Sequence, residues 1–272
     1  MKVLLVDVYN MIYRAKYGFA RGDNSTIFGF FRSLKSEITR HSPDLVYLVL
    51  EGHPKHRFVL NENYKANRVR EPDDDFQRQK EEIFALSHFL PVTIARHPDY
   101  ECDDVIAHMC TQVHPTDSVV IVSSDTDFIQ LLESDDVSLW NPIKKKFIEP
   151  WPVDYVTWKA LKGDPADNIP GVRGIGAKRA HVLCEDWTTL EDFLAAKPER
   201  REVFESAKAQ IRFASLDREL DLLEISSNFF DEERIKNAFT EYGFKSIIGK
   251  AWFKWQTTME GLNDKLSPNA DC

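Results

Sequence analysis

The chain has 272 residues, 43% of them apolar, and a formal net charge of −9. This length and apolar content allow one large hydrophobic core, or one core with a small companion. No apolar run approaches the length of a membrane span, and the first residues lack a signal-peptide pattern, so we expect a cytoplasmic protein without a membrane partner. The four cysteines lack zinc-site spacing and are expected to stay reduced.

Two short basic segments interrupt the acidic chain. Residues 54–70 carry five basic side chains against Glu62 alone, and residues 171–184 carry three basic side chains and no acid. Such short segments favour local phosphate contacts over a broad polycationic surface.

Three apolar runs rich in β-branched residues predict buried strands of a parallel sheet. They cover residues 2–8, 44–51 and 118–122, and residues 137–140 form a weaker fourth run. Residues 28–41 have helical periodicity, which makes the first two strands a βαβ unit.

Each of the three main runs delivers carboxylates at its end. Asp7 and Glu51 end the first two runs, and Asp125 and Asp127 follow the third. Because ligands of open parallel sheets bind beyond the carboxyl ends of the strands, we expect these acids to share one site.

Two further segments supply acids at the start of helical patterns. Glu101, Asp103 and Asp104 lie in the first turn of a predicted helix, where acids also complement the helix dipole. Asp164 and Asp167 precede a glycine-rich hairpin at 171–176, whose backbone N–H groups would suit a phosphate.

Together, five segments contribute nine candidate acids, which would repel one another unless cations or protons neutralised them. Oxygen ligands without a His or Cys pattern favour Mg²⁺ or Mn²⁺, and pairs of such ions about 3.5–4 Å apart are a standard device for hydrolysing phosphodiesters. Without these acids the chain would have no net formal charge, so its acidity is concentrated in the predicted site. The nine are Asp7, Glu51, Glu101, Asp103, Asp104, Asp125, Asp127, Asp164 and Asp167.

These motifs resemble the 5′-nuclease family of flap endonucleases and 5′→3′ exonucleases, which occur alone in phages and as a domain of bacterial DNA polymerase I. They follow the family order over about residues 1–185. The matching segments are Leu5–Asp7 with Asn10 and Arg14, Tyr64–Arg68, Tyr100–Asp104, Ser124–Asp127 and Gly163–Gly176.

The resemblance implies an α/β fold, with a mostly parallel central sheet flanked by helices as in PIN-like nucleases. We expect a nuclease core at 1–150 that includes a helical arch at about 64–95. A helical DNA-binding region would follow at 151–265, with a helix-hairpin-helix element at about 164–185, and residues 266–272 would form a tail. Since no polymerase region follows, we expect a free-standing, monomeric nuclease.

The resemblance also assigns roles to individual residues. A first metal site would use Asp7, Glu101, Asp103 and Asp125, and a second would use Asp127, Asp164 and Asp167. Asp104 would support catalysis, and Lys65 and Arg68 would contact the scissile phosphate. Glu51 stands where the family usually has Asp, and Cys102 where it usually has Ala. Further DNA contacts are implied for Arg57, Tyr64, Arg70, Gly171, Arg173, Gly174, Gly176, Lys178 and Arg179.

The implied activity is hydrolysis near 5′ ends and 5′ flaps of branched DNA, giving 5′-phosphate and 3′-hydroxyl products in replication, primer removal and repair. Two or more Mg²⁺ or Mn²⁺ ions would serve the active site, and K⁺ the helix-hairpin-helix element. Partners would be flapped DNA, RNA primer/DNA hybrids, a DNA polymerase and a single-strand-binding protein. Two alternatives stay open: a PIN-type ribonuclease, which the 171–176 hairpin argues against, and an inactive DNA-junction binder.

Overall fold

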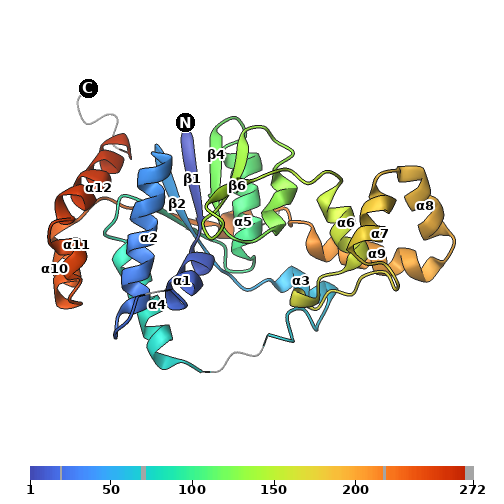
Figure 1. Ribbon diagram of the computed structural model, residues 1–272, viewed down its shortest axis with the longest axis horizontal. Coiled ribbons are helices and arrows are strands. Elements are labelled where there is room, and N and C mark those ends of the chain that lie inside the picture. Colours follow the sequence, from blue (N-terminus) through green and yellow to red (C-terminus); the bar gives the residue numbers. More distant parts are fainter. Residues whose placement is uncertain (19, 69–71, 217–218, 267–272) are drawn as a thin grey trace.

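A seven-stranded sheet forms the centre of the computed structural model, which describes residues 1–18, 20–68, 72–216 and 219–266 (Figure 1). The strand order is β6-β5-β4-β1-β2-β3-β7. Neighbours from β5 to β3 pair in parallel, and the edge strands β6 and β7 pair antiparallel. The strands are β1 (Lys2–Asp7), β2 (Leu45–Leu50), β3 (Thr93–Arg96), β4 (Ser118–Val122), β5 (Val137–Asn141), β6 (Lys146–Ile148) and β7 (Glu224–Ser227). The mostly parallel α/β architecture expected from the sequence is confirmed.

Alternating side chains of the central strands supply the cores on the two faces of the sheet. From β1, Leu4 and Val6 enter one apolar cluster, and Val3 and Leu5 enter the other. The first cluster is covered by α1 (Val8–Lys16), α2 (Ser25–His41), α4 (Asp74–Ser87), α10 (Glu232–Glu241), α11 (Lys245–Ile248) and α12 (Trp252–Leu266). The second is covered by α5 (Cys102–His108), the π-helix η1 (Met109–Val113) and the 3-10 helix η2 (Asp127–Leu131).

A separate helical lobe extends from one end of the sheet, opposite the end covered by α10–α12 (Figure 1). Its own apolar cluster includes Leu161, Leu194 and Phe204, which are at most 1% exposed. The lobe contains α6 (Tyr155–Lys162), η3 (Pro165–Asp167), α7 (Ala177–Cys184), α8 (Trp187–Ala195) and α9 (Pro198–Ile211), and α3 (Lys55–Leu60) lies beside it.

The last part of the chain returns from the lobe to the sheet. After the short helix η4 (Leu220–Leu222), β7 pairs with β3, and Phe239 and Trp255 pack in the same cluster as Phe31 of α2. Within the region expected at 151–265, the helices α10–α12 therefore cover the sheet, whereas α6–α9 form the lobe. The tail expected at 266–272 lies outside the described residues, except that Leu266 ends α12.

Helix α1 directly follows β1 and was not predicted from the sequence. The Asp7 side chain caps it by accepting a hydrogen bond from the backbone N–H of Asn10 at 3.0 Å. Because α1 begins at the residue after β1, with no loop between them, Asp7 is fixed at the carboxyl end of β1. In the part of the chain that the structure describes, no helix is both long and apolar enough to cross a bilayer.

Candidate active site

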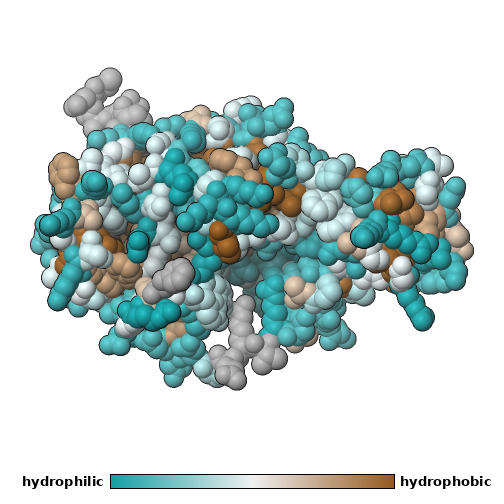
Figure 2. Space-filling view, viewed as in Figure 1, coloured by the Kyte–Doolittle hydropathy of each residue, from teal (hydrophilic) through white to brown (hydrophobic). Residues whose placement is uncertain are grey.

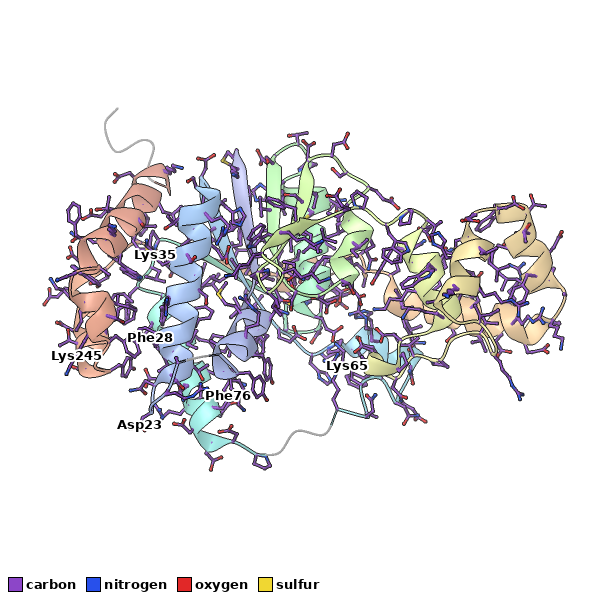
Figure 3. The ribbon with its side chains drawn as sticks, viewed as in Figure 1. Asp23, Phe28, Lys35, Lys65, Phe76 and Lys245 are labelled. Atoms are coloured by element: carbon purple, nitrogen blue, oxygen red, sulfur yellow. The ribbon has the colours of Figure 1, made fainter. Side chains whose placement is uncertain are left out.

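The carboxyl ends of β1, β2 and β4 and the start of α5 meet at one pocket, as the sequence predicted. Six of the nine candidate acids line it, together with Lys65 and Arg68. The molecular surface is hollowed at this edge of the sheet (Figure 2), and Lys65 reaches it from the segment between α3 and α4 (Figure 3). The six acids are Asp7, Glu51, Asp103, Asp125, Asp127 and Asp167.

Four of these acids have no Lys or Arg ion-pair partner among the described residues. We call Asp7, Glu51, Asp103 and Asp125 the uncompensated acids. Burial, with Glu51 and Asp125 nearby, raises the pKa of Asp7 to about 6. Burial and the surrounding carboxylates raise the pKa of Asp103 well above its usual range, and burial with Glu101 raises that of Glu51. Full ionisation of these acids would therefore place negative charge here that no lysine or arginine ion pair balances within the described residues.

Hydrogen bonds fix the orientation of three of the four uncompensated acids. Ser123 donates to Asp7 Oδ2 at 2.8 Å, and the backbone N–H of Cys102 donates to Glu51 Oε2 at 3.2 Å. The Asp125 Oδ1 atom accepts from the backbone N–H of Asp127 at 2.8 Å. Glu51 thus faces the same site as Asp7, although its side chain is one methylene longer than the Asp implied by the resemblance.

The acids assigned to the second metal site are instead held by cations of the protein. Lys159 of α6 is 6% exposed and forms ion pairs with Asp127 and, at 2.6 Å, with Asp164. Arg68 pairs with Asp167. We call Asp127, Asp164 and Asp167 the paired acids. Burial is the largest single effect and raises the pKa of Asp164, but the hydrogen bond and charge of Lys159, with the backbone N–H of Ala166, together lower it overall.

Glu101 and Asp104 lie behind the pocket in a buried ionic network. Arg57, 3% exposed, binds both Asp104 oxygens at 2.8 and 2.9 Å and also pairs with Glu101. The Tyr64 hydroxyl donates to Glu101 at 2.9 Å, and Lys65 forms an ion pair with the same carboxylate. Burial opposes ionisation of Glu101, but Lys65 and Arg57 outweigh it and lower its pKa.

The donor set of the pocket fits divalent cations. Carboxylates at close range carry charge that must be neutralised by protons or metal ions, and hard oxygen donors favour Mg²⁺ or Mn²⁺. The uncompensated acids would hold such an ion without displacing any cation of the protein. At the paired acids, a metal would compete with Lys159 and Arg68.

Two family models match the chain. That of the 5′-3′ exonuclease N-terminal resolvase-like domain covers residues 2–157, and that of the 5′-3′ exonuclease C-terminal SAM fold covers residues 150–231. The chain belongs to the 5′-3′ exonuclease family. It is 34% identical to the thermostable DNA polymerase I of Thermus thermophilus over an alignment of 239 positions that covers 80% of this chain and 28% of the polymerase. With the DNA polymerase I of Treponema pallidum the identity is 34% over 210 residues, 69% of this chain and 21% of the relative. The chain therefore spans under a third of these relatives' length.

Solved structures share the fold of this chain over nearly its whole length. The zinc-bound T5 5′-exonuclease superposes with a TM-score of 0.62 at 21% identity, covering 98% of this chain and 99% of the exonuclease. Flap endonuclease-1 from Methanococcus jannaschii superposes with a TM-score of 0.63 at 16% identity, covering 99% and 94% of the two chains.

Two residues implied to bind DNA are placed differently by the structure. Arg57 directs its guanidinium inward, to Asp104, Glu101 and the Gln210 carbonyl. Tyr64 is 4% exposed and its ring packs in the core of the helical lobe. Both side chains position the buried network and are not available for phosphate binding or base stacking. Arg70, a further implied DNA contact, lies outside the described residues.

The predicted glycine-rich hairpin lies at the surface of the lobe. Gly171 contacts the backbone of Lys162 and Gly163 so closely that an added Cβ would lie 2.3 Å from the Lys162 carbonyl carbon, and Gly174 has a φ of 78°. Both positions require glycine. The implied phosphate-binding side chains Arg173, Lys178 and Arg179 are exposed, and Gly176 precedes the N-terminus of α7. Their DNA contacts stay a prediction.

Sequence reasoning missed Lys159 and Tyr155, which lie one helical turn apart and both contact Asp127. The sequence carries a weak signal, because Lys159 shares a helix face with the apolar residues of α6. A lysine on such a face needs a buried partner.

Proposed function

We propose that this protein is a metal-dependent, structure-specific 5′ nuclease that cuts DNA near 5′ ends and 5′ flaps, leaving 5′-phosphate and 3′-hydroxyl products. The observation that carries the proposal is the convergence of the uncompensated acids with Lys65 and Arg68 in one pocket. Family membership supports the same reaction class.

The chain's own residues would divide the work. Asp7, Glu51, Asp103 and Asp125 would hold one divalent metal, and the paired acids a second. Metals bound there would supply Lewis-acid activation of water and of the phosphodiester. Lys65 and Arg68 would bind the scissile phosphate and stabilise the negative charge that develops on it.

Both cations now pair with carboxylates, so the substrate phosphate must compete for them. Lys65 pairs with Glu101, and Arg68 pairs with Asp167. A metal ion beside these carboxylates would weaken their hold on the two cations. Metal loading is therefore expected to free Lys65 and Arg68 for the phosphate.

The wider setting follows from the same proposal. The exposed cations at the start of α7 would bind duplex phosphates, with K⁺ at the hairpin, and the segment at 64–95 would border the single-stranded 5′ end. Replication, primer removal and repair would be the processes served, with a DNA polymerase and a single-strand-binding protein as partners. We propose that the protein acts as a monomer in the cytoplasm.

One experiment tests the reaction directly. A DNA with a 5′ flap, labelled at either end, is incubated with the protein in Mg²⁺, Mn²⁺ or EDTA. Metal-dependent release of a short 5′ fragment, cut near the junction, is expected. The 5′-phosphate is checked by ligation of the product to an acceptor strand.

The same assay separates the alternatives. If a matched RNA flap is cleaved while the DNA flap stays uncut, a PIN-type ribonuclease would be favoured. Tight binding of the flap without cleavage in either metal would favour an inactive junction binder, and Glu51→Asp would then be the first variant examined.

A further inference from the structure

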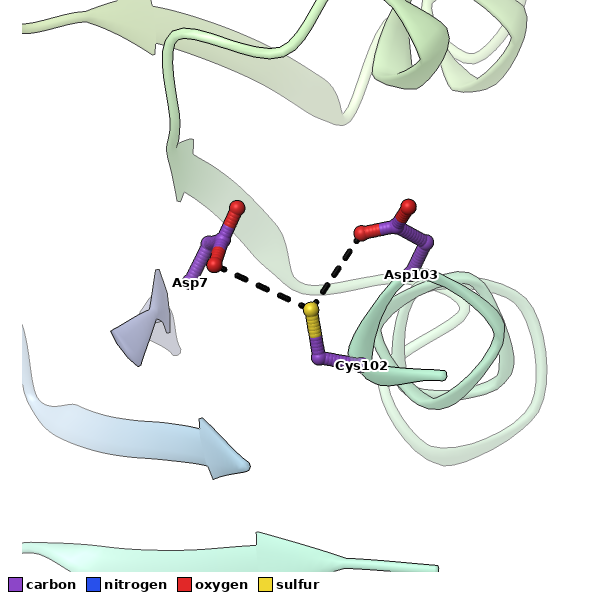
Figure 4. Close-up of side chains that lie close together, drawn as sticks. All are labelled: Asp7, Cys102 and Asp103. Atoms are coloured by element: carbon purple, nitrogen blue, oxygen red, sulfur yellow. Dashed lines mark hydrogen bonds between the residues drawn. The ribbon is translucent and has the colours of Figure 1, made fainter. Parts of the chain in front are cut away.

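Cys102 places a thiol among the uncompensated acids. Its sulfur lies 3.3 Å from Asp103 Oδ1 and 3.7 Å from Asp7 Oδ1, between the two carboxylates (Figure 4). One ligand atom from each of these three residues lies within 4.8 Å of the others. Cys102 is 3% exposed and opens α5, so the helix start fixes the position of its thiol.

The spacing of these atoms suits a small tetrahedral ion. Zinc bonds of about 2.3 Å to sulfur and about 2.0 Å to oxygen, at tetrahedral angles, separate the sulfur from each oxygen by roughly 3.5 Å. The two observed separations, 3.3 and 3.7 Å, lie on either side of that value. Mg²⁺ and Mn²⁺ prefer oxygen ligands, whereas soft thiolate selects zinc-like ions. A thiol at this point therefore changes which ions the pocket prefers.

We propose that Cys102, with Asp7 and Asp103, binds thiophilic divalent cations such as Zn²⁺ and Cd²⁺, and that these ions occupy the uncompensated acids in preference to Mg²⁺ and inhibit the enzyme. The sulfur–metal bond forms as the thiol proton passes to solvent. The inhibition rests on the proposed nuclease function, but the binding does not.

Cys110 provides a matched control. It lies two helical turns beyond Cys102, is 4% exposed, and packs in the apolar cluster on that face of the sheet. Cys102→Ala and Cys110→Ala remove the same atoms from similarly buried positions. Cys102→Ser keeps the side chain's size but replaces soft sulfur with hard oxygen.

The first test titrates the reduced, metal-stripped full chain with Cd²⁺ and follows the ultraviolet charge-transfer absorption of a thiolate–cadmium bond. The wild type and Cys110→Ala are expected to gain this band with one equivalent of Cd²⁺, and both Cys102 variants to lack it. Competition with a chelating dye should show Cd²⁺ binding weakened by about tenfold or more in Cys102→Ala, as expected for the loss of about 1.4 kcal/mol.

The second test measures Zn²⁺ inhibition of flap cleavage at fixed Mg²⁺. Cys102→Ser should need about tenfold more Zn²⁺ for half inhibition than Cys110→Ala. An undiminished cadmium band and affinity in both Cys102 variants would overturn the proposal. If neither the wild type nor any variant cleaved DNA, but the cadmium band was present only in proteins that keep Cys102, the nuclease proposal would fail and the metal-binding inference would stand.

Discussion

The two halves of the acid pocket balance their charge by different means. The uncompensated acids lie on β1 and α5 and just beyond the ends of β2 and β4, and no lysine or arginine is ion-paired to them in the described part of the chain. The paired acids are held by Lys159 and Arg68. One half thus has no lysine or arginine of the described chain paired to it, while in the other half each acid already pairs with a lysine or an arginine.

This difference predicts unequal metal binding. Ions should enter the uncompensated half first, because there they relieve repulsion and displace nothing. In the paired half, each ion must offset the ion pairs that it disrupts. Two binding steps of different affinity are therefore expected when Mg²⁺ is titrated calorimetrically.

The largest effect is expected for Asp125→Asn, which removes a charge from the uncompensated half. Turnover should fall by about 10³-fold, because charge stabilisation in the pocket is lost while the shape is kept. Flap binding in Ca²⁺ should change little. Asp135→Asn, at an exposed position, is the control. Single-turnover cleavage in Mg²⁺ measures the loss, and full activity of Asp125→Asn would remove the basis of the proposed site.

Lys159→Met should destabilise the metal-free protein by about 3 kcal/mol, because it leaves two half-buried carboxylates without their shared cation. Thermal unfolding in EDTA measures this change, and Lys144→Met, at an exposed position, is the control. Mg²⁺ should restore more stability to the variant than to the wild type. Equal stability of the two proteins would mean that the paired half is not held together by Lys159.

Asp7→Asn should stabilise the metal-free protein, which is the opposite of the effect expected for Lys159→Met. The pKa of Asp7 is raised to about 6 in the fold, above its ordinary value of 3.8. The folded state therefore binds the proton more tightly, and this group's contribution to stability falls as pH rises from about 4 to 6. In EDTA at pH 8, the substitution should stabilise the protein by about 2 kcal/mol. Urea unfolding at pH 8 and at pH 4 checks this, since the gain should vanish at pH 4.

The smallest effect is expected outside both halves, in the glycine-rich hairpin at 171–176 that precedes α7. Arg173→Ala should weaken flap binding in Ca²⁺ by a few-fold and reduce the salt dependence by about one phosphate contact, without changing Mg²⁺ binding. Fluorescence anisotropy at several salt concentrations measures both quantities. Lys254→Ala, on the exposed face of α12, is the control. If flap affinity depended on salt concentration equally in the two variants, the DNA would not contact the hairpin at Arg173.

Much of the uncompensated half could be predicted from the sequence. Buried parallel strands leave a clear apolar signature, and their carboxyl ends share an edge, so Asp7, Glu51 and Asp125 could be placed together without coordinates. The start of α5 was likewise visible from its acids and the apolar face that follows.

The partners of the acids could not be predicted in this way. Arg57 and Tyr64 lie in a polar, basic segment that reads as exposed, and only the tertiary packing of that segment against α9 and Glu101 buries them. Ion pairs such as Lys159 with Asp164 depend on geometry that periodicity does not encode. The short edge strand β7 was missed because all four of its residues are exposed and it lacks an apolar run.

The pairing of β7 with β3 affects where the chain can be shortened. The second family model ends at residue 231, but a chain cut there would lose α10–α12 and uncover the apolar surface of α2. A cut before residue 224 would also leave β3 as an open sheet edge, a template for aggregation. Any fragment meant to isolate the nuclease should therefore keep the sequence through α12, even though those helices lie far from the acids.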